Sequence, residues 1–336
     1  MQIDKPGGIW RPYLELVRPP ALFTSAADSL AGWAWVISLL SFTNETKVIN
    51  TNSLLISEFI GVTLLLISIS ALIYAAGMIT NDIFDYQEDL KDRPFRPLPS
   101  ERVSRSIAWS LAIGFQTTAL LLTCVLVWSL GLQTYLPLWL SFFTIMMTYC
   151  YNKVFKQTLV APIFMGLCRL GNFWIGASLI FIFIGFNDPI IQTFIQLPLL
   201  TSMGTLLYVT SLTSLSRYEV KGGKGARYWA LCLLILSSHP LWWLWADMLM
   251  PQSALHHLLI YIVTAVNTFW LALQLKKLIL KDVTALQVQK AVGSGIRGVA
   301  LCNISLCIAF HSWFLATVIM IMTLSAKKVA QWFYAT

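Results

Sequence analysis

Residues 81–105 read NDIFDYQEDLKDRPFRPLPSERVSR, and this stretch decides how the rest of the chain is interpreted. It follows a hydrophobic run that ends near Thr80, and it packs five of the chain's fifteen acidic residues into eleven positions. If the helix of that run continues, side chains three, four and seven apart share one face. Such a helix aligns four polar side chains, with Asp82 and Asp89 beside them: Asn81, Asp85, Glu88 and Asp92.

Crowded carboxylates repel one another, so this cluster predicts cations bound among them. Oxygen-only ligands suit a hard ion such as Mg²⁺, which proteins usually hold together with substrate phosphates. The helix should then end in a basic, proline-rich loop that holds Arg93, Arg96, Arg102 and Arg105 with Pro94, Pro97 and Pro99. Acids that hold a metal, followed by bases that bind anions, predict a site for a metal-bound diphosphate. The same mixed charge is also typical of a plain cytoplasmic loop.

The composition excludes an ordinary soluble protein. Hydrophobic residues make up 57% of the 336 residues and charged residues 11%, whereas soluble domains hold roughly a quarter charged residues. The mean hydropathy of +0.71 predicts an all-α integral membrane protein. The six cysteines lie in hydrophobic runs without a C-x-x-C pair, which predicts neither disulfides nor a cysteine metal site. The net charge of +8 is explained by its distribution among the loops, so we expect no nucleic-acid partner.

Nine hydrophobic stretches are long enough to cross a bilayer, which takes about 20 residues each. They lie near residues 21–41, 56–80, 106–130, 133–151, 158–186, 194–215, 228–249, 254–275 and 297–325. With the N-terminus in the cytoplasm, 19 Lys and Arg residues fall in cytoplasmic connections and 3 on the opposite side. This bias predicts a multi-pass protein, of the bacterial inner membrane, whose C-terminus lies opposite its N-terminus. We expect residues 1–20 to form an interfacial amphipathic segment, and 21–336 one nine-helix domain.

Charged and polar residues within the spans indicate a chamber between helices. Arg169 and Asn172 lie three apart in the fifth span, and an arginine facing lipid would cost on the order of 3 kcal/mol. We therefore expect both side chains to line a polar cavity. Asp28 in the first span also requires a protein partner, which the sequence does not name. Arg18, just ahead of that span, is interpreted as a topology marker.

Further charges follow the fourth and sixth spans at the same cytoplasmic end. Lys153 and Lys156 come after the fourth span, and Arg217 comes after the sixth. These bases either bind the same diphosphate or only record the positive-inside bias, and both interpretations remain open. Glu219 is the one carboxylate between the sixth span and the seventh.

The order Asn-Asp-x-x-Asp-x-x-x-Asp, followed by Arg-Pro-x-Arg-Pro-Leu, resembles the first aspartate-rich motif of the UbiA superfamily of intramembrane prenyltransferases. Its motif positions are Asn81, Asp82, Asp85 and Asp89. Arg18 and Pro19 also stand where the superfamily carries an Arg-Pro pair ahead of the first span, which adds to the resemblance. The resemblance implies a helical bundle around a central cavity, with lysines after the fourth span as phosphate contacts. That superfamily also carries a second aspartate-rich motif after a tyrosine. Here Tyr208 is followed only by Ser216 and Glu219.

The altered second motif leaves three alternatives open. One metal ion is held by the first motif and Glu219, or a second ion is held more weakly, or the protein has lost catalysis. The form Ser-Arg-x-Glu-Val-x-Gly-Gly, residues 216–223, resembles the EboC-like branch of the superfamily, which is found with bacterial ebo gene clusters.

The sequence thus predicts Mg²⁺-dependent transfer of a prenyl group from an isoprenyl diphosphate to a small aromatic or hydroxylated acceptor, within membrane lipid. The expected metal ligands are Asn81, Asp82, Asp85, Asp89 and Glu219. The expected substrate contacts are Arg93, Arg96, Lys153, Lys156, Arg169, Asn172 and Arg217. The expected catalytic groups are Asn81, Asp82, Asp85 and Asp89, with Tyr208 or Tyr149 shielding an allylic cation through its ring. A catalytically silent isoprenoid-diphosphate binding protein and a secondary transporter are the alternatives, although a transporter usually shows internal repeats and broken helices.

Overall fold

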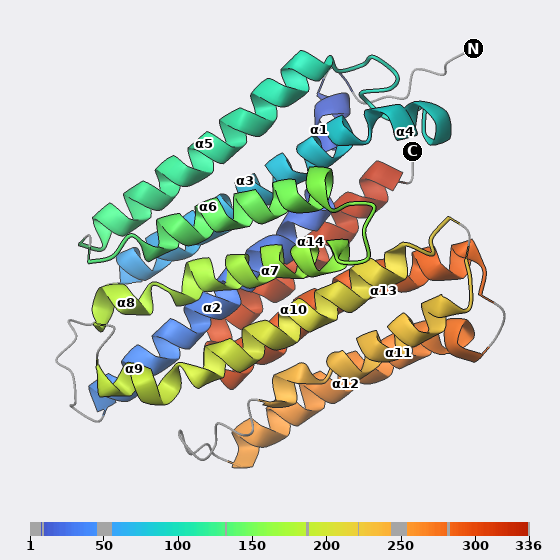
Figure 1. Ribbon diagram of the computed structural model, residues 1–336. Coiled ribbons are helices and arrows are strands. Elements are labelled where there is room, and N and C mark those ends of the chain that lie inside the picture. The colour runs from blue at the N-terminus through green and yellow to red at the C-terminus, as the bar shows by residue number, and fades with distance from the viewer. Residues whose placement is uncertain are drawn as a thin grey trace.

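The computed structural model describes residues 8, 10–45, 56–131, 133–185, 188–220, 222–242, 254–280 and 283–334. These residues form helices, turns and no strand, arranged as a bundle of roughly parallel and antiparallel rods (Figure 1). Parts of the sequence analysis fall outside them: residues 243–249 of the expected span 228–249, and the loop residues Lys47, Lys221 and Lys281.

The helices follow one another in the order α1 (Arg11–Val17), α2 (Pro19–Glu45), α3 (Ile56–Phe84), α4 (Tyr86–Asp92), α5 (Arg105–Ser129), α6 (Leu136–Tyr149), a π-helical turn (Cys150–Val154), α7 (Ala161–Ala177), α8 (Ile180–Phe183), α9 (Pro189–Phe194), α10 (Gln196–Ser216), α11 (Gly225–Leu236), α12 (Ala254–Leu280), α13 (Ala285–Ala309) and α14 (Trp313–Tyr334).

Helix α2 lies at the centre of the bundle and packs against α3, α7, α13 and α14. Its contact with α7 depends on two glycines. A Cβ added to Gly32 would lie 2.1 Å from the carbonyl oxygen of Phe173, and one added to Gly176 would lie 2.0 Å from that of Ser29. The two backbones therefore approach more closely than any larger residue permits, as is common between membrane helices.

Six helical segments of the described chain are long and apolar enough to cross a bilayer: Ile56–Phe84, Arg105–Ser129, Ala161–Phe183, Pro189–Ser216, Leu255–Ile279 and Ala285–Ala309. The outer helices expose large apolar side chains, such as Leu121 and Trp128 on α5 and Phe269 on α12. An aqueous environment would not favour such surfaces, whereas lipid does. The chain is a multi-pass membrane protein.

The expected ninth span, 297–325, is wrong, because the chain turns back within it. Helix α13 begins at Ala285, well before the expected start of this span, and ends at Ala309. His311 then adopts a left-handed conformation (φ 54°), and α14 runs back beside α13. The apolar composition continues across this turn, so hydropathy alone hides it. Figure 1 shows α14 ending at the same end of the bundle as α1 and α4.

The N-terminal helix α1 packs on protein rather than lying freely at an interface. Its Leu16 is fully buried against Ile79, Leu98 and Val103. Arg102 also donates a hydrogen bond of 2.7 Å to the Glu15 carboxylate, which attaches α1 to the proline-rich loop after α4. Helix α1 and this loop together cover the end of α3.

Candidate active site

The aspartate-rich stretch is not one continuous helix. Helix α3 ends at Phe84, and Asp85 forms the turn that leads into α4. The expected stripe of acids is therefore divided. Asp82 and Asp89 are only 3% and 2% exposed, whereas Glu88 and Asp92 at the outer side of α4 are exposed.

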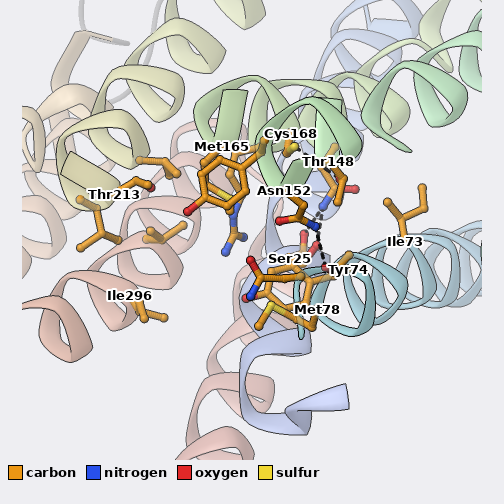
Figure 2. A pocket seen from close by; sticks show the side chains of 18 of the residues that line it. Ser25, Ile73, Tyr74, Met78, Thr148, Asn152, Met165, Cys168, Thr213 and Ile296 are labelled. Carbon is orange, nitrogen blue, oxygen red and sulfur yellow. Dashed lines mark hydrogen bonds between the residues drawn. The ribbon is translucent and has the colours of Figure 1, made fainter. Parts of the chain in front are cut away.

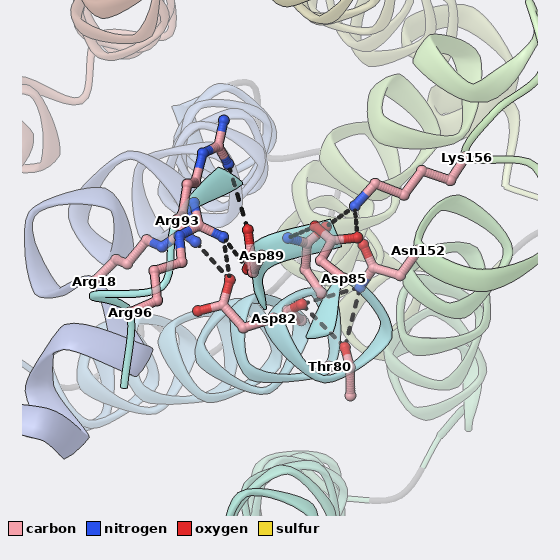
Figure 3. Close-up of polar contacts among 11 residues, drawn as sticks. Arg18, Thr80, Asp82, Asp85, Asp89, Arg93, Arg96, Asn152 and Lys156 are labelled. Carbon is pink, nitrogen blue, oxygen red and sulfur yellow. Dashed lines mark hydrogen bonds and ion pairs between the residues drawn. The ribbon is translucent and has the colours of Figure 1, made fainter. Parts of the chain in front are cut away.

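The two buried aspartates share basic partners. Arg96 donates to Asp89 Oδ2 at 2.6 Å and to Asp82 Oδ1 at 3.3 Å (Figure 3). Arg18, from the junction of α1 and α2, donates to the same Asp82 oxygen at 2.6 Å. Arg93 lies farther away, with Nη1 3.9 Å from Asp89 Oδ1. The desolvated carboxylates are thus neutralised by arginines from two segments far apart in the chain.

Asp85 and Asn81 form a second group, on the other side of the same helix end. Lys156 contacts Asp85 Oδ1 directly and donates to Asn81 Oδ1 at 3.1 Å (Figure 3). The Asn81 amide donates to the second Asp85 oxygen at 3.0 Å. Lys153 lies elsewhere: its side chain is exposed, and its ammonium is 5.8 Å from the centre of the Phe84 ring. Only one of the two expected lysines therefore reaches the aspartates.

The loop between α4 and α5 is held in place by buried apolar residues and a cap. Leu98 and Val103 are buried at its base, and the Ser100 hydroxyl donates to the Arg96 carbonyl at 2.6 Å. Ser104 caps α5 by accepting from the Ile107 N–H at 3.3 Å. The prolines end α4 as the sequence predicted, and the ordered loop aims Arg96 at the two buried aspartates.

A cavity of about 310 Å³ opens beside this cluster and extends between α3, α7, α10 and α13. Arg18 and Asn81 lie at its polar end, next to the carboxylates. Figure 2 shows Met78 and Met165 facing one another across it, with Ile296 on a further wall. One end of the cavity is therefore charged, and much of its wall is apolar.

Arg169 and Asn172 line this cavity, as the sequence predicted. Arg169 donates to Asp28 Oδ2 at 2.8 Å and to the Thr24 carbonyl at 2.7 Å. Asn303 of α13 donates to the other Asp28 oxygen at 2.8 Å. Arg169 is thus the partner that Asp28 requires, and the network joins α2, α7 and α13 below the cavity.

Tyr208 and Arg217 do not occupy the positions that their expected roles require. Tyr208 is buried behind the cavity wall, and its hydroxyl donates to the Gly295 carbonyl at 3.0 Å. Arg217 is exposed and donates to the Thr158 carbonyl. The tyrosines that line the cavity are Tyr74 and Tyr151.

Glu219 lies on the turn after α10 and is not among the residues that line the cavity. Burial raises the pKa of Glu219, and the charge of Arg93 lowers it in part. Ser216, one turn earlier, lines the cavity instead. Within the described ranges, no three acidic, histidine or cysteine side chains are grouped closely enough to hold a metal ion by themselves. An ion here therefore needs ligands from a bound molecule.

Sequence reasoning missed two residues that line the charged end of the cavity. Arg18 was assigned to topology, although it binds Asp82. Asn152 lies on the π-helical turn after α6 and donates to Thr80 Oγ1 at 3.0 Å and to the Gly77 carbonyl at 3.0 Å. The signal for Asn152 was an amide directly after Tyr151 at the end of a span. For Arg18 the signal was the Arg-Pro pair ahead of the first span, but it did not point to Asp82, which lies 64 residues away.

The donor chemistry of the cluster fits a magnesium ion. Asp82, Asp85 and Asp89 supply carboxylate oxygens and Asn81 an amide oxygen, which are the ligand types that Mg²⁺ prefers. The cationic groups of Arg96 and Lys156 contact these oxygens. They therefore supply the positive charge that a metal ion would otherwise bring to the carboxylates. Exchange of one cation for another keeps the carboxylates neutralised.

The sequence matches the profile of the UbiA prenyltransferase family over residues 48–296, well over half of the chain. The chain belongs to this family. Among curated relatives, this UbiA protein is 32% identical over 125 residues to a digeranylgeranylglyceryl phosphate synthase of Methanobrevibacter smithii. That alignment covers 35% of this chain, and the chain spans 39% of the relative's length.

Solved structures extend the likeness of fold to nearly the whole UbiA chain. A structure described for digeranylgeranylglyceryl phosphate synthase in membranes superposes with a TM-score of 0.57 at 16% identity, covering 90% of this chain and 99% of that one. A UbiA homologue from Archaeoglobus fulgidus, bound to DMAPP and Mg²⁺, gives a TM-score of 0.55 at 17% identity, covering 88% and 98%. The predicted all-helical UbiA bundle is confirmed.

Proposed function

We propose that this protein transfers a prenyl group from an isoprenyl diphosphate to a small aromatic or hydroxylated acceptor, in a reaction that depends on Mg²⁺. The observation that carries the proposal is the position of the cavity: its charged end adjoins Asp82, Asp85 and Lys156, and its walls are apolar. A prenyl diphosphate has the same two parts, a charged head and a greasy tail.

The head of the donor would lie at the charged end of the cavity. Mg²⁺ would be held by Asp82, Asp85 and Asp89 together with diphosphate oxygens, and it would stabilise the charge that develops on them. The bases that would contact the same oxygens are Arg18, Arg96 and Lys156, with Arg93 nearby. Lys153 and Arg217 are left out of this set, because Lys153 lies against the Phe84 ring and Arg217 donates to the Thr158 carbonyl. Glu219 is left out because the charged group that acts on it is Arg93.

The chain's own bases favour bond cleavage in this arrangement. As the allylic C–O bond breaks, its electron pair leaves with the diphosphate, so negative charge grows where Arg96 and Lys156 are fixed. The allylic carbon becomes positive, and the rings of Tyr74 and Tyr151 lie on the cavity wall, where they can face it. The acceptor then forms the new bond and gives up one proton.

A catalytically silent binder of isoprenoid diphosphates is the competing reading, because the second aspartate motif is altered. We would incubate the purified protein in lipid nanodiscs with radiolabelled geranylgeranyl diphosphate, Mg²⁺ and a lipid extract. A labelled product other than the free alcohol supports the transferase. Tight binding of the donor, with neither diphosphate release nor a labelled product, supports the silent binder and contradicts the proposal.

We further propose that the aspartate end of the bundle faces the cytoplasm, since most of the loop lysines and arginines collect there. A single domain, residues 21–336, would carry the whole activity, with α1 as a cover. Cysteine-accessibility labelling of a residue placed in the 93–104 loop tests the orientation in intact cells.

A further inference from the structure

The inner end of the cavity carries one polar atom that the protein itself does not satisfy. Asn172 is only 3% exposed, and its amide nitrogen donates to the Ser25 carbonyl at 2.7 Å and to the Ser25 hydroxyl at 2.8 Å. Its Oδ1 atom accepts no hydrogen bond from any residue that the structure describes, although Asn172 lines the cavity. A buried acceptor left without a donor is destabilising, so this atom favours a ligand that carries an N–H or O–H group.

Arg169 lies beside Asn172, one helical turn earlier on α7, and also lines the cavity. A guanidinium carries five N–H groups, and three hydrogen bonds go to Asp28 and Thr24. Its face also lies 5.6 Å from the centre of the Tyr74 ring, which lines the same cavity. A hydroxyl group is both donor and acceptor, so it complements Asn172 Oδ1 and a remaining N–H of Arg169 together.

The charge of Arg169 is already neutralised. Asp28 is fully buried, lies 2.8 Å from the guanidinium and is itself held by Asn303. A carboxylate ligand at this place would add a second negative charge to a neutral ion pair, because the charge of Arg169 is already matched by Asp28. Because a buried unpaired charge is costly, the inner end of the cavity disfavours anions.

We infer that the inner end of the cavity, formed by Asn172 and Arg169, selects an uncharged acceptor that donates a hydroxyl hydrogen bond, and excludes a carboxylate acceptor. The inference rests on the proposed function, which makes the ligand at this end the prenyl acceptor. It deepens that function by naming the acceptor's charge and hydrogen-bonding class. The buried Asp28 is a positioning and specificity residue, since it acts through Arg169.

Two small probes with the same ring test this selection. We would measure the binding of 4-hydroxybenzyl alcohol and of 4-hydroxybenzoate to the protein in nanodiscs at pH 7.5 by calorimetry, without any prenyl donor. The wild-type protein should bind the alcohol at least tenfold more tightly than the carboxylate. Equal or tighter binding of the carboxylate, or binding of neither probe, overturns the inference.

Two variants assign the selection to these residues. Asn172→Leu should weaken binding of the alcohol at least tenfold. Its matched control is Asn267→Leu on α12, which removes another buried amide oxygen that lacks a donor among the described residues but lies outside the cavity. Asp28→Asn should shift the ratio of the two affinities at least tenfold towards the carboxylate. An equal effect of both leucine variants, or an unchanged ratio in a folded Asp28→Asn protein, contradicts the inference.

The failure of the inference can be told from the failure of the proposed function. Diphosphate release from geranylgeranyl diphosphate is measured separately, in the absence of any acceptor. If the protein releases diphosphate but does not bind the alcohol more tightly than the carboxylate, only the acceptor assignment is wrong. An alcohol preference without diphosphate release removes the enzyme and leaves a selective binding site.

Discussion

The guanidinium of Arg18 lies 2.6 Å from the carboxylate of Asp82, across 64 residues of sequence. Arg18 adopts a left-handed backbone conformation (φ 51°) at the point where α1 ends and α2 begins. A non-glycine residue rarely adopts this conformation, which costs of order 1–3 kcal/mol unless the surroundings hold it. The burial of Leu16 and the ion pair with Asp82 hold it here, and they place a base at the charged end of the cavity.

Replacement of Arg18 should therefore weaken binding of the diphosphate donor. A hydrogen bond to a charged group contributes roughly 1.5–3 kcal/mol, which corresponds to a rise in donor KM of about 10- to 100-fold in Arg18→Ala. The control is Arg11→Ala, since Arg11 lies on the same helix and pairs with Glu15 away from the cavity. Steady-state diphosphate release over a range of donor concentrations measures both. Equal KM values for the two variants would contradict the role.

The two lysines after α6 should differ, although they are only three residues apart. Lys156 contacts Asp85 and Asn81, whereas Lys153 is exposed beside Phe84. We expect Lys156→Met to raise the donor KM about tenfold or more, and Lys153→Met to have a much smaller effect. The same kinetic assay decides between them. A larger rise of the donor KM in Lys153→Met than in Lys156→Met would contradict the roles inferred from the geometry. It would favour the family resemblance, which assigned both lysines to the diphosphate.

Removing one partner of the Asp28–Arg169 ion pair should lower the free energy of unfolding more than removing both partners. Loss of one partner leaves a buried charge without its counterion, so Asp28→Leu should lower the free energy of unfolding by about 3–5 kcal/mol. The double variant Asp28→Leu, Arg169→Met removes both charges and should regain much of that loss. Denaturant unfolding in detergent micelles measures the three proteins. A double variant less stable than the single one would refute the interpretation.

Tyr74, to which the sequence assigned no role, should act at the cavity in place of Tyr208. The Tyr208 hydroxyl bonds the Gly295 carbonyl behind the cavity wall, so Tyr208→Phe should lower the free energy of unfolding by about 1 kcal/mol and affect turnover little. Tyr74 lines the cavity beneath Arg169, so Tyr74→Leu should lower kcat several-fold through loss of its ring. A larger fall of kcat in Tyr208→Phe would restore the original assignment.

The sequence predicted the parts of this molecule that depend on local composition. The acids and bases of residues 81–105 and the polar pair Arg169 and Asn172 lie at the cavity, because charge is tolerated in a membrane bundle only where it faces protein or a cavity. The turn at His311 escaped prediction, since an apolar run shows no break where a single left-handed residue reverses the chain.

Contacts between distant segments were harder to predict than the motif itself. The pairs Arg18 with Asp82 and Asp28 with Asn303 depend on how helices pack, which no local pattern states. The assignments of Tyr208, Lys153 and Glu219 rested on their order along the chain. The contacts of Tyr208 with the Gly295 carbonyl and of Lys153 with the Phe84 ring depend on how the helices pack, which that order does not state.

The most direct measurement is the release of diphosphate from radiolabelled geranylgeranyl diphosphate by purified protein, with Mg²⁺ and with EDTA. Wild-type protein should release diphosphate only with Mg²⁺, and Asp85→Asn should reduce the rate at least 100-fold, since it weakens the hold on the ion and on Lys156. Asp92→Asn, at an exposed position of the same motif, should keep the wild-type rate. Release that persists in EDTA, or that falls equally in both variants, would contradict the assignment of the aspartate cluster as the metal-diphosphate site.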